Sequence, residues 1–181
     1  MSEKSNRSNG GIVIRIVFAA ILIISGLSGI SKVLSKNDIK DIDIPTVMLN
    51  EFAADKNGVE FCVTNVDNQK SVGSDYLEVT TEYNFVVVTI KIANNSSEPY
   101  DVNSLRFVLM NGETEYEYAT DTIMSLDNAL TLDTVNPGIT KEYNIAYETP
   151  VTTDDSEFVL KIKDNAVLED DCVYITLKDS K

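Results

Sequence analysis

From about residue 47 to the carboxyl terminus, apolar side chains recur at every second position in short runs. Successive residues of a strand point to opposite sides, so this alternation gathers the apolar side chains of each run on one face. In the clearest run, FVVVTIKIAN at 85–94, one face holds Val86, Val88, Ile90 and Ile92. Turn-forming residues separate the runs, which is typical of an all-β domain.

The runs predict about seven to nine strands and no helix. Besides 85–94 they are VMLNEFAA, VEFCVTNV, YLEVTT, LRFVLM, TEYEYA, ITKEYNIAYETP, EFVLKIK and DCVYITLK. Asn57-Gly58 and Asn111-Gly112 indicate tight hairpin turns, and YLEVTT is expected to be a short edge strand after a polar loop at 67–75. Because each sheet would have one apolar face to bury, we predict an antiparallel two-sheet sandwich, with a closed barrel as the alternative.

Residues 12–30, IVIRIVFAAILIISGLSGI, form the one long apolar run of the chain. Nineteen residues in a helix just cross a hydrocarbon core of about 30 Å. We therefore predict a single transmembrane signal anchor, with residues 1–11 as a cytoplasmic tail and 31–46 as a juxtamembrane linker. Residues 47–181 would then form one extracytoplasmic domain at the cell membrane. The alternative is a signal peptide cleaved near Gly26-Leu27-Ser28, where no Ala-x-Ala site is present.

Composition excludes several classes of function. Residues 31–181 contain 28 acidic and 12 basic residues, a net charge of −16, which disfavours binding to nucleic acid or anionic lipid headgroups. The chain has no histidine, so Ser-His-Asp and Cys-His catalysis and ordinary zinc sites are absent. We expect neither an enzyme nor a bound cofactor.

The two cysteines, Cys62 and Cys172, lie in the first clear strand and in the last. By alternation each points away from the apolar face of its own strand. A disulfide between them is feasible if those strands are neighbours, and it would stabilise the fold by up to about 4.7 kcal/mol. We predict such a bridge in an oxidising compartment, with two unbridged thiols as the alternative.

Acidic side chains cluster in the loops near the carboxyl terminus. Oxygen ligands of this kind suit calcium, and the candidate ligands are Asp154, Asp155, Asp164, Asp170 and Asp171. No segment has EF-hand spacing, and solvated loop charge is the commoner explanation of such clusters. A solute- or calcium-binding module is therefore the alternative function.

The run TEYEYA alternates polar residues with tyrosine, a pattern typical of a strand at the edge of a sheet. An unpaired edge accepts a strand from a partner, and tyrosine suits recognition surfaces. Tyr116 and Tyr118 are therefore the candidate interaction edge. Cross-strand packing is the other explanation of these tyrosines.

Three segments carry a resemblance to a known family: FVVVTIKIANNSSEP (85–99), LRFVLMNGETEY (105–116) and VNPGITKEYNIAYETP (135–150). Their order resembles the telokin-like, immunoglobulin-type extracytoplasmic domain of unknown function found in Gram-positive surface proteins and lipoproteins. The resemblance covers about residues 47–163 and implies an immunoglobulin-like sandwich without catalytic residues. It departs from the family in lacking a lipoprotein cysteine. The expected function is a membrane-anchored module that binds a protein or cell-envelope partner.

Overall fold

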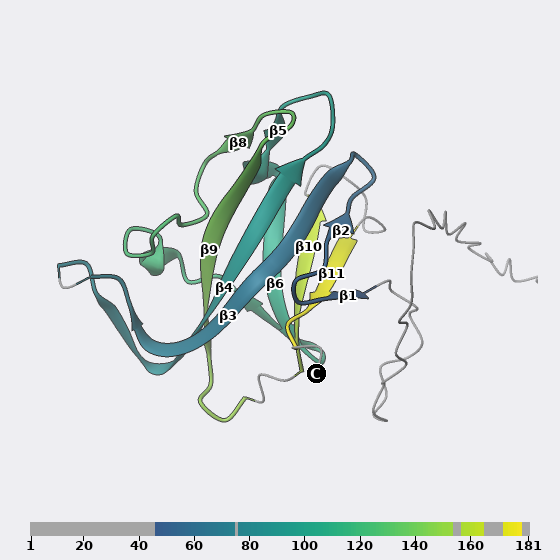
Figure 1. Ribbon diagram of the computed structural model, residues 1–181. Helices are drawn as coiled ribbons and strands as arrows, with labels where there is room; N and C mark the ends of the chain where they lie inside the picture. The colour runs from purple at the N-terminus through teal and green to yellow at the C-terminus, as the bar shows by residue number, and fades with distance from the viewer. Residues whose placement is uncertain (1–45, 75, 154–156, 165–171, 179–181) are drawn as a thin grey trace, which may run out of the picture. The chain divides into compact units, whose positions relative to one another are not determined.

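The computed structural model describes residues 46–178, apart from residue 75 and the segments 154–156 and 165–171 (Figure 1). The predicted tail (1–11), span (12–30) and nearly all of the linker (31–46) lie outside the described residues. No helix in the described part of the chain is long and apolar enough to span a membrane. The described helices are the short 3-10 turns η1 (Val102–Ser104) and η2 (Thr120–Thr122).

The first sheet has five strands. Their order is β1 (Thr46–Met48), β11 (Cys172–Thr176), β10 (Phe158–Asp164), β6 (Leu105–Asn111) and β7 (Thr114–Glu117). Neighbours are antiparallel except for β1 and β11, which pair in parallel. The prediction of a wholly antiparallel sandwich is therefore wrong at this pair. β1 and β11 are the first and last strands of the domain, so no hairpin turn sets their relative direction.

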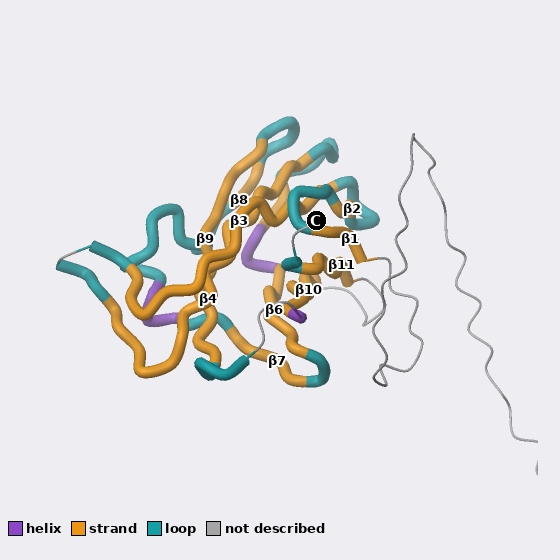
Figure 2. The backbone as a smooth tube through the Cα atoms, turned by 60° about the horizontal axis from the view of Figure 1, so that its bottom comes forward, coloured by secondary structure: helices purple, strands orange, loops and turns teal. Residues whose placement is uncertain are grey.

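The second sheet has four antiparallel strands. Their order is β2 (Ala53–Ala54), β3 (Val59–Val72), β4 (Val79–Asn94) and β9 (Thr140–Thr149). A separate ladder joins β5 (Tyr100–Asp101) to β8 (Thr134–Val135). Figure 2 shows β3, β4 and β9 on one side of the domain and β6, β7 and β10 on the other.

One buried apolar cluster lies between the two sheets, as predicted for a sandwich. The alternating positions of β4 enter it as the sequence indicated, and so do those of the other long strands. Its largest members include Phe61, Ile90, Ile92, Phe107, Leu109, Tyr147, Phe158, Leu160, Ile162 and Ile175, all with almost no exposed surface. The all-β class and the buried faces are therefore confirmed.

Asn94, the last residue of β4, holds the chain at one end of the sandwich. Its side chain has no exposed surface. The amide nitrogen donates to the carbonyl oxygens of Glu98 and Val135, both at 2.8 Å. The amide oxygen accepts from the Ser96 backbone nitrogen at 2.9 Å and from its hydroxyl at 2.6 Å. All the polar capacity of this buried side chain is thus used.

The backbone of Asn94 also forms hydrogen bonds, with the turn that precedes β9. Its nitrogen donates to the Ile139 carbonyl at 3.0 Å, and its carbonyl accepts from Gly138 at 2.7 Å. Gly138 has a φ of +74° in the Asn136-Pro137-Gly138 turn. The Asn-Asn-Ser-Ser end of β4 and the turn before β9 are therefore one structural corner.

The hairpin of β3 and β4 is longer than the sequence indicated. Residues 65–84, which we call the arm, begin beside β4 in the second sheet and, beyond the pair Gln69–Phe85, extend past the sandwich at the left of Figure 1. The predicted polar loop at 67–75 is wrong up to Val72, because β3 runs to that residue. The last three residues of YLEVTT, 79–81, do form a strand, but they begin the long β4 and are not a separate short edge strand. Two register shifts, between Val63 and Asn65 and between Gln69 and Ser71, interrupt the ladder. Such bulges bend a strand pair and increase its twist.

Residues 119–130, which we call the strap, cover the outer edge of β9. The Ala119 nitrogen donates to the Ala146 carbonyl at 2.8 Å, and the Leu130 nitrogen donates to the Asn144 carbonyl at 3.0 Å. The Asn144 nitrogen donates in turn to the Asn128 carbonyl at 2.9 Å. These bonds occupy backbone groups that an edge strand otherwise presents to other chains.

Tyr147 is a core residue whose hydroxyl has no hydrogen-bond partner among the described residues. Its side chain is fully buried, and burial raises its pKa well above the usual value for tyrosine. An unsatisfied buried hydroxyl costs about 1–3 kcal/mol. We expect Tyr147→Phe to raise the free energy of unfolding by about 1 kcal/mol, measured by urea and thermal denaturation.

Tyr143 is the matched control on the same face of β9. Its hydroxyl donates to Asp133 Oδ2 at 2.8 Å. Tyr143→Phe removes a bond that is made, so it should lower stability by about 1 kcal/mol. Equal changes in the two variants would contradict the assignment of the unsatisfied group.

Candidate interaction surfaces

The predicted disulfide between Cys62 and Cys172 is absent, and no bridge joins the two residues. The bridge required their strands to be neighbours, but β3 belongs to the second sheet and β11 to the first. Both side chains point away from the core on their own sheet, so they face opposite sides of the sandwich. Burial raises the pKa of the Cys62 thiol, partly offset by Lys91. The Cys62 thiol is therefore less reactive than an ordinary one at neutral pH.

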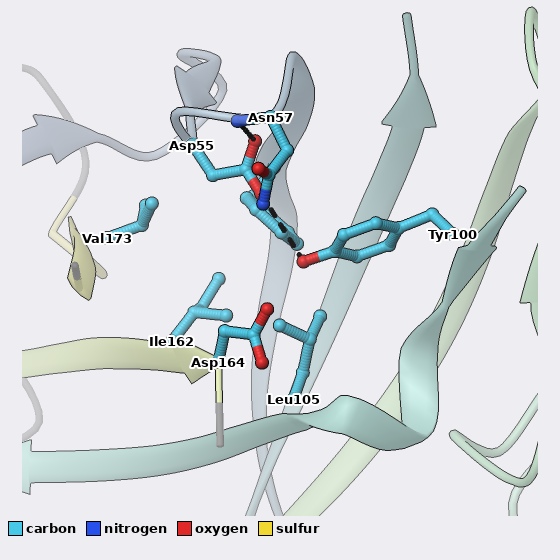
Figure 3. A pocket seen from close by; sticks show the side chains of 8 residues that line it. Asp55, Asn57, Tyr100, Leu105, Ile162, Asp164 and Val173 are labelled. Carbon is cyan, nitrogen blue, oxygen red and sulfur yellow. Dashed lines mark hydrogen bonds between the residues drawn. The ribbon is translucent and has the colours of Figure 1, made fainter. Parts of the chain in front are cut away.

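Of the calcium candidates, Asp164 alone is described; Asp154, Asp155, Asp170 and Asp171 lie outside the described residues. Asp164 ends β10 and lines a hollow at the end of the sandwich with Asp55 and Tyr100 (Figure 3). Within the described part of the chain, no three acidic or cysteine side chains converge on a position that would hold a metal.

This hollow is small, and the Asp55 carboxylate that lines it already accepts hydrogen bonds from the protein itself. Its volume is about 10 Å³, roughly the room that one water needs. Asp55 Oδ1 accepts from the backbone nitrogens of Asn57 and Val59, each at 2.8 Å, and Oδ2 accepts from the Tyr100 hydroxyl at 3.3 Å. Ligand pockets are typically some 300–1,000 Å³. The hydrogen bonds of Asp55 stabilise the turn at 55–59. The hollow beside it is too small for an organic ligand.

The predicted interaction edge lies where the sequence placed it, since β7 is the outermost strand of the first sheet. Its tyrosines, however, face inward. Tyr116 packs edge-on against Phe158, with ring centroids 6.4 Å apart and planes at 89°. Tyr118 is half-buried against the core, and its backbone forms an isolated antiparallel β-bridge with that of Tyr147. A partner at this edge would therefore meet the backbone and the glutamates of β7 before the two tyrosine rings.

The glutamates of β7 are paired with cations on neighbouring strands. Lys161 on β10 approaches Glu115 Oε1 at 3.1 Å, and Arg106 on β6 forms an ion pair with Glu117. The hydrogen bond that Arg106 donates to Glu117 raises the pKa of Arg106 further. These exposed pairs contribute little stability, but they neutralise the outer face beside the edge.

Three other edges in the described sheets are covered or very short. The strap covers β9, while β1 and β2 have three and two residues. β7 offers four residues with an unpaired outer row of backbone groups. It is an uncovered edge, as is the outer side of β3 beyond Val63, which β2 does not reach.

Asp133 anchors the segment after the strap, and sequence reasoning did not single it out. Both of its carboxylate oxygens accept from Lys141 Nζ at 2.8 Å, and Tyr143 donates to Oδ2. Lys141 and Tyr143 are two residues apart on β9, a spacing that puts both on one face. No motif links them to residue 133, so only the folded backbone reveals the cluster.

This cluster makes stability depend on pH. The hydrogen bond from Lys141, followed by that from Tyr143, lowers the pKa of Asp133 below its ordinary 3.8. A lowered folded-state pKa stabilises the fold above the unfolded-state pKa, and this contribution is lost as pH falls through the folded-state pKa.

Asp133→Asn should therefore lower the urea midpoint at neutral pH, and the difference from the unchanged chain should disappear as pH falls through the folded-state pKa of Asp133. The exposed Asp121, changed to asparagine, provides the control and should alter neither value appreciably. A difference between Asp133→Asn and the unchanged chain that stays constant down to acid pH would contradict the assignment.

Comparison of the chain with known protein families shows which family it belongs to. A family model described as a domain of unknown function, DUF4352, matches residues 49–171. No curated protein matches the chain. The matched segment agrees with the range over which the resemblance was predicted.

Solved structures share the fold. A conserved hypothetical protein from Bacillus anthracis is 18% identical, with 69% of this chain and 94% of that chain covered and a TM-score of 0.53. The yjhA protein from Bacillus subtilis is 13% identical, with 74% and 100% covered and a TM-score of 0.57. An uncharacterised β-sandwich protein from Clostridium difficile is 13% identical, with 78% and 100% covered and a TM-score of 0.48.

At these identities the first two likenesses show the fold alone. The family match covers well over half of the chain and agrees with the β-sandwich described above. The chain therefore belongs to the DUF4352 family of domains of unknown function.

Proposed function

We propose that this protein is a membrane-anchored, extracytoplasmic sandwich of the telokin-like, immunoglobulin type that binds a protein or cell-envelope partner. The apolar run at 12–30 precedes the domain and is long enough to span a membrane. The strongly acidic domain disfavours nucleic acid. We propose a binding role without catalysis or a cofactor.

The uncovered edge of β7 is the observation that carries this proposal. Its two glutamates are neutralised by Lys161 and Arg106, so a partner strand would not have to desolvate unpaired charges. Backbone groups along Thr114–Glu117 are available to extend the first sheet by one strand. With Tyr116 packed on Phe158, the contact would use the backbone more than aromatic side chains.

Crosslinking in intact cells tests the proposal. A photoreactive amino acid replaces Glu113, an exposed residue in the turn before β7, and the control replaces Glu142, which is exposed on β9. We expect a discrete crosslinked protein or wall fragment from position 113 and not from position 142. Equal products at both positions would contradict an edge contact.

Location is tested separately. The full chain should sediment with membranes, and protease added to protoplasts should digest the domain while the cells stay intact. A chain that resists protease until the cells are lysed would contradict the extracytoplasmic proposal.

A further inference from the structure

The arm is held in place at its far end by the strap. Val72 and Phe85 are buried in a second apolar cluster with Val87 and Ala146, and Ala119 and Leu126 of the strap pack against it. This cluster lies on the outer face of the second sheet, because its members alternate with the core residues of β4. The arm and the strap therefore form one packed unit beside the main core.

The turn of the arm contacts the strap closely at Gly73. A Cβ built on this glycine would lie 2.5 Å from the Leu77 carbonyl oxygen and 2.8 Å from Ser125 Cβ. Its φ of +102° is a conformation that other residues rarely adopt. Gly73 therefore lies between the Leu77 carbonyl and Ser125, so the backbone of Leu77 and that of Ser125, which follows Met124, come together at the tip of the arm.

The side chains of Tyr76, Leu77 and Met124 are exposed although the structure around them is packed. Tyr76 is 97% exposed, Met124 78% and Leu77 53%. We call this group the tip patch. Folding does not need these side chains, because the second cluster holds the arm without them. Grouped apolar side chains on an ordered surface are typical of protein contact sites.

The charge around the tip patch selects its partner. The described residues of the arm and strap include five acids and one base, Lys70. The Lys70 ammonium donates to the carbonyl oxygens of Glu82 and Tyr83, so it is already engaged. The acids are Asp67, Glu78, Glu82, Asp121 and Asp127. This charge repels anionic lipid and attracts basic protein segments.

We propose that the tip patch, together with the acidic residues of the arm and strap, is a docking surface for a segment of a partner protein. That segment carries both basic and apolar side chains. The inference rests on the proposed binding function and adds a second surface, distant in sequence from β7. Apolar contact supplies most of the affinity, and the acidic surround steers the partner and sets its charge class.

Binding of designed peptides to the full chain in nanodiscs tests this inference. The probe is an amphipathic peptide of leucine and lysine, compared with a leucine–glutamate peptide and a serine–lysine peptide. We expect binding of the first alone, weakened by salt. The triple variant Tyr76→Ser, Leu77→Ser and Met124→Ser should lower its affinity by about tenfold or more.

The control variant removes three other exposed apolar side chains, by Leu132→Ser, Ile139→Ser and Val151→Ser. It should bind the leucine–lysine peptide as the unchanged chain does, with unchanged thermal melting in both triple variants. Equal losses in the two variants, no binding, or equal binding of the leucine–glutamate peptide would overturn the inference. Binding to anionic vesicles through the tip patch would overturn it in favour of a membrane contact.

A photoreactive residue at position 76 in intact cells separates this inference from the proposed function. Crosslinked peptides rich in lysine or arginine and apolar residues support docking at the tip. Crosslinks from position 113 without any from position 76 would leave the proposed function intact and remove the tip as a surface. The absence of both would remove both.

Discussion

Replacing Asn94 by alanine is expected to lower the free energy of unfolding by about 3 kcal/mol. The change removes the side-chain donor to the Val135 carbonyl oxygen and one of the two donors to the Glu98 carbonyl oxygen, which keeps the Ser96 hydroxyl. It also removes the acceptor for the Ser96 backbone nitrogen and hydroxyl. The bond to Val135 is buried and the other three are part-buried, and the Asn94 side chain has no exposed surface. An unsatisfied buried polar group costs about 1–3 kcal/mol, so the loss of four bonds exceeds the effect of an ordinary surface change.

Asn94→Asp tests the same corner with almost no change in size. A carboxylate keeps the acceptor for Ser96 but places two negative oxygens near the carbonyls of Glu98 and Val135. Repulsion and burial of the charge should make this variant at least as unstable as Asn94→Ala at neutral pH. Protonation at acid pH should recover part of the loss.

Asn95 provides the control, because it has the same side chain one residue further on and is exposed. Its amide donates to Glu60 Oε2 at 2.9 Å, a surface bond whose loss should cost less than about 1 kcal/mol. Urea denaturation at pH 7 measures all three variants. Similar midpoints for Asn94→Ala and Asn95→Ala would show that the corner does not contribute as argued.

Local pattern was sufficient to predict the strands and their buried faces. Alternation in 85–94 indicates a strand whatever it pairs with, and Asn111-Gly112 indicates a hairpin, in which Gly112 adopts a positive φ. The predictions that required distant pairing were less reliable. The Asn94–Val135 bond joins residues 41 positions apart, and no pattern in either segment indicates that the two meet.

The cysteine prediction shows the same limit. Alternation placed both side chains outside the core correctly, but it carries no information on which sheet a strand joins. The edge position of β7 was predictable, because its polar alternation reflects one wet face. The inward direction of Tyr116 was not used in choosing it as a contact, although the same alternation implies it.

The tip patch was missed because polar residues at 67–75 are typical of a loop. In the structure this segment continues β3 and turns at Gly73. A glycine between two polar runs signals a turn, but its contact with Ser125 depends on where the strap lies. The shape of the arm is therefore a tertiary property.

Gly73→Ala should detach the tip from the strap. The added Cβ would lie 2.5 Å from a backbone oxygen, that of Leu77, which cannot rotate away as a side chain can. A φ of +102° adds the strain of a conformation unfavourable to alanine. We expect the steric clash and the backbone strain together to lower the stability of the arm by about 3 kcal/mol.

Gly112→Ala is the matched control, since Gly112 also has a positive φ, +58°, but no atom lies within 4 Å of the added Cβ. Its cost should be near 1 kcal/mol, from the backbone alone. Urea denaturation compares the overall losses, and amide hydrogen exchange locates them.

In Gly73→Ala, protection should fall in the arm and strap while β6 and β10 keep theirs, because the second cluster is separate from the main core. Affinity for the leucine–lysine peptide should fall with it, since the backbones of Leu77 and Ser125 at the tip patch would no longer be held together. If exchange rose evenly through both sheets, the arm would belong to the same cooperative unit as the sandwich. If peptide affinity stayed unchanged while the arm opened, a fixed arrangement of the tip patch would not be needed for docking.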